Sequence, residues 1–183
     1  MDKNDTTFIA LFRGINVGGN NIIPMATLSA FFVQAGCQNP KTYIQSGNVL
    51  FNADPGRVEQ ILADVRKSIA DHLGLSVPIV LRDLESLSSA VQANPFPDAE
   101  PKKLHLVFLY DKPTEKQLAN LNPDYSPPDQ FVVKGSEIYL YLPQGAAGSK
   151  CNNAYFDSRL KTTSTMRNWK TVLKLMELGK ELS

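Results

Sequence analysis

The chain has 183 residues, of which 43% are hydrophobic and 20% are charged, and its net charge is +1. A chain of this length forms one large domain or two small ones and buries a core without metals or disulfides. It has no apolar run as long as a membrane span and no apolar leader, and Cys37 and Cys151 lie far apart with no CxxC motif. We therefore expect a reduced, cytoplasmic protein without membrane contact.

The first half of the chain alternates strands and helices in the order β-α-β-β-α-β. Continuous apolar runs predict strands, whereas apolar residues spaced three and four apart predict helices, which Gly36 and Gly74 end. A Ser46-Gly47 pair between two short strands is typical of a hairpin. The predicted elements are a strand at 7–12, a helix at 24–35, strands at 42–45 and 48–51, a helix at 58–73 and a strand at 77–81.

The second half repeats this order as far as β-α-β-β-α. Its hairpin turn, Gly135-Ser136, stands in the place that the earlier Ser-Gly turn has in the first half. A predicted helix at 84–92 and a proline-rich link at 94–101 come before this repeat. Its predicted elements are a strand at 104–110, a helix at 114–121, strands at 130–134 and 137–142, and helices at 154–160 and 166–178.

The element order predicts an α+β fold built from two ferredoxin-like (RRM-like) halves, residues 1–93 and residues 94–183. The strands at 7–12 and 104–110 are apolar on both faces, whereas the helices of one such half cover one face only. We therefore expect the second face to be covered by the other half, as in a pseudo-dimer, or by a second subunit, as in a homodimer.

Charge is spread unevenly along the chain. Residues 83–143 carry five basic and nine acidic side chains, whereas residues 144–183 carry seven basic and three acidic ones. In the predicted C-terminal helix, Arg167, Lys170 and Lys174 form a basic stripe behind a hydroxyl-rich N-terminus that is suited to phosphate. This basic segment faces either an anionic partner or the acidic middle of the same chain. Alternatively, the stripe is only a solvated charged face behind an ordinary helix cap.

Three stretches stand out as possible signatures, namely residues 11–19 (LFRGINVGG), 43–49 (YIQSGNV) and 165–172 (TMRNWKTV). Together they resemble the signature sequences of the bacterial DUF1697 family, whose function is uncharacterised. The resemblance implies two ferredoxin-like halves joined as a pseudo-dimer, in agreement with the element order. The chain differs from the family at Asn20, where lysine is common, and at Met166, where threonine is usual. The first difference removes a positive charge from the glycine-rich loop.

The glycine-rich loop matches neither of two standard phosphate-binding patterns. It lacks the Lys-Ser/Thr pair of a P-loop, and its glycines, Gly14, Gly18 and Gly19, do not have the GxGxxG spacing. The N–H groups of Gly18 and Gly19 beside Arg13 are suited to an anion. Alternatively, the glycines only allow a strand-to-helix turn with positive φ.

A second polar segment, from Gln45 to Asn48, meets this loop if the first and third strands pair antiparallel. Arginine and amide side chains bind ligands but do not titrate near neutral pH, so the combination indicates binding rather than catalysis. Alternatively, Asn16 and the other amides satisfy backbone groups of the long loop.

Signals for catalysis, cofactors and RNA are weak. His72 and His105 are isolated, so they form neither a triad nor a metal site, and Cys151 would be reactive only if exposed. We expect no cofactor and no metal. The third strand keeps only the glycine and one aromatic residue, Phe51, of an RNP1 motif.

We therefore expect a binding protein that holds an anionic ligand, either a nucleotide-like molecule or a nucleic-acid backbone, in a cleft between the halves. One alternative is a small-molecule enzyme of unknown class, and another is a scaffold or interaction protein whose signature residues are purely structural. The predicted ligand-binding residues are Arg13, Asn16, Gly18, Gly19, Gln45, Ser46, Asn48, Ser149, Lys150, Arg167 and Asn168.

Overall fold

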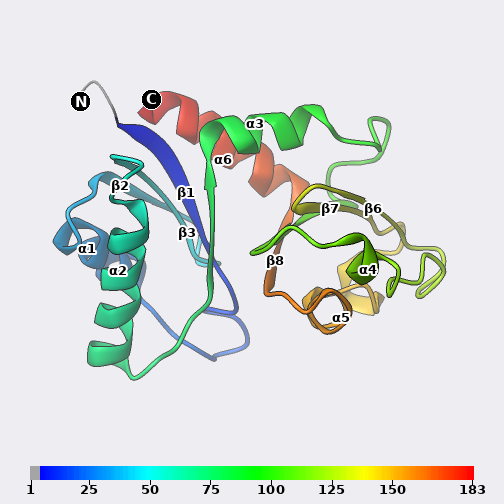
Figure 1. Cartoon of the computed structure of the whole chain (residues 1–183), viewed down its shortest axis with the longest axis horizontal. Helices are drawn as coiled ribbons and strands as arrows, with labels where there is room; N and C mark the ends of the chain where they lie inside the picture. The colour runs from blue at the N-terminus through cyan, green and yellow to red at the C-terminus, as the bar shows by residue number, and fades with distance from the viewer. Residues whose placement is uncertain (1–4) are drawn as a thin grey trace. The chain divides into compact units, whose positions relative to one another are not determined.

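The computed structural model describes residues 5–183 and shows an α+β protein with two four-stranded antiparallel sheets (Figure 1). The chain forms two compact units. The first unit runs to Leu87 and also takes in Leu175–Ser183, and the second unit comprises Ser88–Lys174. The predicted boundary lay after residue 93, whereas the first unit here runs only to Leu87. The end of the chain also belongs with the first unit and not with the second.

The first unit is an antiparallel sheet with two helices on one face. Its elements are β1 (Thr6–Phe12), α1 (Met25–Gln34), β2 (Gln38–Tyr43), β3 (Asn48–Ala53), α2 (Val58–Leu73) and β4 (Ile79–Asp83). The strand order is β2-β3-β1-β4, and α1 and α2 pack on the same face (Figure 1). Strand β2 ends before the predicted residue 45, because Ile44 takes a left-handed conformation with φ of 49° and turns the chain toward β3.

The second unit has the same connectivity, with the strand order β6-β7-β5-β8. Its elements are β5 (Leu104–Leu109), α4 (Glu115–Leu118), β6 (Gln130–Lys134), β7 (Glu137–Tyr141), the short 3-10 helix η1 (Ala146–Gly148), α5 (Asn153–Leu160) and β8 (Ser164–Asn168). Two further helices, α3 (Leu84–Gln92) and α6 (Trp169–Leu182), each contribute residues to both units.

Strand β8 corrects the prediction, which placed a helix over 166–178. Residues Ser164–Asn168 instead pair antiparallel with the central strand β5, with Thr165 opposite Phe108. The sequence Ser-Thr-Met-Arg-Asn has no helical spacing of apolar residues, so its pairing with β5 decides its conformation. The second unit thereby completes the β-α-β-β-α-β order that the first unit shows.

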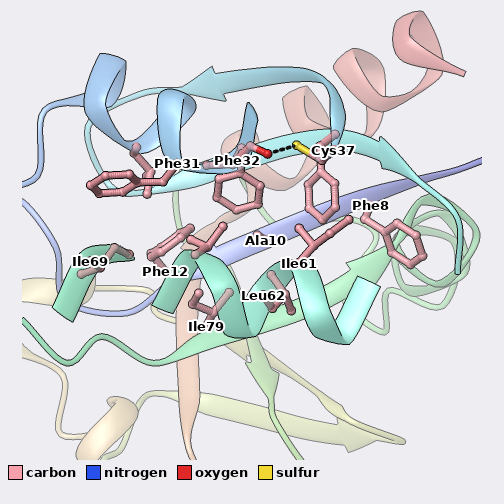
Figure 2. Close-up of a cluster of buried hydrophobic side chains, with 14 of the residues drawn as sticks. Phe8, Ala10, Phe12, Phe31, Phe32, Cys37, Ile61, Leu62, Ile69 and Ile79 are labelled. Carbon is pink, nitrogen blue, oxygen red and sulfur yellow. Dashed lines mark hydrogen bonds between the residues drawn. The ribbon is translucent and has the colours of Figure 1, made fainter. Parts of the chain in front are cut away.

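The core of the first unit lies between its sheet and its two helices (Figure 2). Phe51 of β3 contacts Phe8 of β1 and Phe32 of α1, with ring centroids 5.8 Å and 5.0 Å apart. The Cys37 thiol donates a hydrogen bond to the Phe32 carbonyl at 2.9 Å, drawn as a dashed line in Figure 2. Full burial of each large apolar side chain stabilises the folded state by about 1.5–3 kcal/mol. The helices therefore cover the face of the sheet that carries these side chains.

The C-terminal part of α6 completes the first unit. Gly179 packs so closely that an added Cβ would lie 2.6 Å from Leu84 Cδ1 and 3.7 Å from Leu50 Cδ2. The fully buried Asn52 Nδ2 also donates a hydrogen bond to the Leu182 carbonyl at 3.3 Å. Part of the second face of the first sheet is therefore covered by a helix that was predicted to belong to the second half.

A pair of glycine substitutions tests how closely the β2–β3 turn is packed. Gly47 has φ of 77°, and an added Cβ would lie 2.5 Å from Ile15 Cδ1 and 2.7 Å from Phe12 Cβ. At the matching β6–β7 turn, Gly135 has φ of 61°, and a Cβ added there would lie 3.7 Å from its nearest neighbour, Glu137 Oε2. We expect Gly47→Ala to lower the free energy of unfolding by about 3 kcal/mol and Gly135→Ala by about 1 kcal/mol, because only the first adds a clash to the backbone strain.

Urea unfolding followed by circular dichroism measures both losses. Equal losses would contradict the prediction, because they would mean that Ile15 and Phe12 move aside without cost.

Candidate functional site

The glycine-rich loop of the first unit folds as a tight turn. Gly18 and Gly19 have φ of 59° and 78°, the two positive values that a type I′ turn requires. The Asn20 N–H closes the turn by donating to the Val17 carbonyl at 3.1 Å. The glycines are thus needed for the turn itself, which agrees with the structural alternative to anion binding.

Asn16 holds this loop in place through backbone groups. Its Oδ1 accepts a hydrogen bond from the Ile23 N–H at 2.8 Å, and its Nδ2 donates to the carbonyls of Ile23 and Gln45, each at 2.9 Å. Asn16 itself has φ of 55°, a conformation that asparagine tolerates better than most residues. The contact with Gln45 confirms that the two predicted polar segments lie side by side.

The β2–β3 turn is stabilised in the same way. Asn48 is fully buried, and its Nδ2 donates to the Tyr43 carbonyl at 2.9 Å and to Ser46 Oγ at 3.2 Å. Arg13, at the end of β1, is half-buried, and its N–H donates to the Pro78 carbonyl at 3.0 Å. The amides in this region therefore satisfy groups of the protein, and their part in binding a ligand remains a prediction.

Arg167 and Asn168 lie on β8, so the expected basic helical stripe does not include Arg167. Arg167 is 7% exposed, and its guanidinium donates to Thr165 Oγ1 at 2.8 Å and to the Met166 carbonyl at 3.0 Å. Burial lowers the pKa of Arg167 to about 10. Asn168 caps the N-terminus of α6, because its Oδ1 accepts a hydrogen bond from the Lys170 N–H at 3.0 Å.

The remaining two predicted residues, Ser149 and Lys150, line a groove of about 430 Å³ on the second unit. Its walls are the loop that precedes β6 and the segment that runs from η1 into α5. Every lining residue belongs to the second unit, so this groove differs from the predicted cleft between halves. Its charged, hydroxyl and aromatic lining residues are Tyr125, Ser149, Lys150, Tyr155, Ser158 and Arg159.

Two cations give this groove its electrostatic character. Lys150 and Arg159 both line it and are solvent-exposed, and no aspartate or glutamate is among its lining residues. The Arg159 guanidinium carbon lies 5.9 Å from the centre of the Tyr155 ring, within the range of a cation–π contact. The groove can therefore attract an anion, and its lining contains no histidine, cysteine or carboxylate that could act as a base or nucleophile.

The aromatic part of the groove was not predicted from the sequence. Tyr125 and Tyr155 stack with centroids 4.0 Å apart and planes 9° apart, although thirty positions separate them in the chain. Tyr125, Tyr155 and Arg159 do not belong to a recognisable motif. The stack of the two tyrosines depends on how the loop before β6 folds, which no local pattern predicts. The only local signal in the sequence was the Ser149-Lys150 pair, which precedes the helix that contains Tyr155 and Arg159.

The comparisons with known proteins identify the family. The chain belongs to the DUF1697 family, described as proteins of unknown function, because the family model matches residues 6–139. The stretch at 165–172 that resembles the third signature lies beyond the matched residues. A search of curated proteins gives no match.

Among solved structures, the chain is similar to a conserved bacterial protein from Streptococcus pneumoniae. The two share 21% sequence identity with a TM-score of 0.71, and the match covers 96% of this chain and 99% of that chain. At this level of identity the likeness concerns the fold.

Residues 5–183 contain neither a candidate membrane-spanning helix nor a candidate metal site. None of their helices combines the length and the apolar character needed to cross a membrane. Nor do three or more potential metal-ligating side chains gather in this part of the chain.

Both cysteines are expected to resist alkylation in the folded protein. Burial raises the pKa of Cys151 to about 11 and that of Cys37 to about 12, so neither thiol forms much thiolate at neutral pH. We expect iodoacetamide to leave both unmodified in the native protein and to modify both in urea, as measured by mass spectrometry. Rapid native labelling of Cys151 would instead favour the enzyme alternative.

His105 makes the stability of the second unit depend on pH. It lies on β5 and is 8% exposed, and its Nδ1 has no hydrogen-bond partner among the described residues. Burial lowers its pKa below the ordinary value of 6.5, so on acidification the unfolded chain takes up a proton before the folded one does. This group therefore makes the folded state less stable as the pH falls below about 6.5.

Replacing the histidine tests this effect. We expect the loss of stability between pH 7 and pH 5 to be smaller in His105→Gln than in the wild type, as measured by thermal unfolding at each pH. His72→Gln, at an exposed position on α2, controls for the loss of a histidine. An unchanged pH dependence in His105→Gln would contradict the assignment.

Proposed function

We propose that this protein binds an anionic ligand, a nucleotide-like molecule or a nucleic-acid phosphate, in the groove between Lys150 and Arg159. The observation that carries the proposal is the composition of that groove, which combines two exposed cations with no acidic lining residue. The cations would supply charge-assisted hydrogen bonds to phosphate or carboxylate oxygens, which are stronger than neutral ones.

The position of the groove at the start of α5 adds to its attraction for anions. Asn152 caps this helix by accepting a hydrogen bond from the Tyr155 N–H at 3.1 Å, and both residues line the groove. The N-terminus of a helix carries a partial positive charge, which supports an anion placed beside it. The volume of about 430 Å³ falls in the range of small-molecule sites.

Binding is favoured over catalysis by what lines the groove. General acid–base catalysis most often uses a histidine, and carboxylates and cysteines also serve, but none of these lines the groove. The nearby thiol of Cys151 is buried. A ligand-binding role therefore needs fewer assumptions than turnover.

The shared strand order of the two units supports a related proposal about the fold. Strands β1 to β4 and β5 to β8 occupy equivalent places in their sheets. We propose that the units are ferredoxin-like halves that arose by internal duplication, in keeping with the element order read from the sequence.

A double substitution tests the binding site. We expect Lys150→Ala together with Arg159→Ala to weaken the binding of inorganic phosphate and AMP by about tenfold or more, because two charge-assisted contacts are lost. Isothermal titration calorimetry at low ionic strength measures both affinities. Lys116→Ala together with Lys170→Ala is the matched control, because it removes the same charge from exposed positions outside the groove.

A further variant separates this groove from the glycine-rich loop. Arg13→Ala should leave the affinities unchanged if the ligand binds in the second unit. Loss of binding in Arg13→Ala, together with full binding in the Lys150 and Arg159 double variant, would move the site to the first unit. Equal weakening by the control pair would show that only net charge matters.

A further inference from the structure

The geometry of the groove points to a mononucleotide as its ligand, with the base stacked on Tyr125 and the phosphate held by Lys150 and Arg159. This inference rests on the proposed anion binding and adds to it a contact for the base of the ligand. It is carried by the pair of stacked tyrosines that lines the same groove as the cations.

The two tyrosines divide into a support and a contact surface. Tyr155 is 6% exposed and lies edge-on to Phe156, with ring centroids 5.2 Å apart. Tyr125 lies parallel to Tyr155 and is 37% exposed. The parallel stack covers one face of Tyr125, and we infer that the exposed part of this residue contacts a further planar group, which nucleobases provide.

The support for this surface is fixed by hydrogen bonds. The Tyr155 hydroxyl accepts from the Asn122 N–H at 2.9 Å and donates to the Asn122 carbonyl at 3.4 Å. The Tyr125 N–H donates to the same carbonyl at 3.2 Å. The Tyr155 ring and the Tyr125 backbone are thereby tied to one residue, which reduces the conformational entropy that is lost when a base stacks.

The cation side of the groove is tied to the same loop. Ser126 Oγ, next to Tyr125, accepts a hydrogen bond from the Lys150 N–H at 3.3 Å and donates to Asp129 Oδ2 at 2.8 Å. The backbone of Lys150, from which its charged side chain extends, is therefore held at a set spacing from the loop that carries Tyr125. Such a spacing favours a ligand whose ring and phosphate belong to one small molecule.

A nucleic-acid strand fits the groove less well than a single nucleotide does. Binding along a strand uses successive aromatic platforms and a track of positive charges. Here only one exposed ring and two cations line the groove, and the same loop carries the exposed carboxylate of Asp124. The acidic side chain would repel a second phosphate passing over the loop.

The test compares ligands that share a phosphate and differ in the ring. We expect wild-type protein to bind AMP or GMP about tenfold more tightly than ribose 5-phosphate in calorimetric titrations, because base–aromatic stacking adds affinity. Tyr125→Leu, which keeps an apolar cover over Tyr155, should bring the nucleotide affinities down to that of ribose 5-phosphate. Tyr125→Phe, which keeps the ring, should retain the difference.

The outcomes separate this inference from the proposed function. Equal binding of nucleotides and ribose 5-phosphate to the wild type would overturn the ring inference and leave anion binding standing. Binding of neither would overturn both. Tight, salt-sensitive binding of a short single-stranded oligonucleotide, with no binding of mononucleotides, would overturn the mononucleotide in favour of a nucleic-acid strand.

Discussion

The structure depends on central strands that are buried on both faces. In β1, Ile9 and Leu11 point to one side of the sheet and Ala10 and Phe12 to the other, and all four are fully buried. Such a strand is stable only if both sides of its sheet are covered. Helices α1 and α2 cover one side of the first sheet, and the last part of α6 covers a region of the other around Leu50.

Polar groups in the first unit follow from the same constraint. A chain that buries this much backbone must pair the N–H and carbonyl groups of its connecting loops. Asn16 and Asn48 do this at one end of the sheet, each with its side chain bonded to the protein backbone. In the second unit the groove residues Lys150 and Arg159 keep their charges in solvent instead. The amides of the first region thus bond to the protein backbone, whereas the cations of the second region are exposed to solvent.

Local patterns in the sequence predict most elements and little of their assembly. The helix at 58–73 and the strand at 7–12 carry strong periodic or continuous apolar signals, so the predicted ranges agree with α2 and overlap almost completely with β1. Antiparallel pairing also places Asn16 beside Gln45, as expected. Strand β8 lacks such a signal, because its conformation depends on pairing with β5 across more than fifty residues. The stack of Tyr125 on Tyr155 depends in the same way on a distant loop.

The discontinuity of the first unit has a consequence for how the chain folds during synthesis. The second unit is one continuous segment, Ser88–Lys174, whereas the first needs Leu175–Ser183 to cover Leu50 and to pair with Asn52. On the ribosome, therefore, the unit that is made first is the one completed last. Until the final helix emerges, an apolar region of the first sheet stays open to solvent or to a chaperone, while the second unit already has its entire sequence.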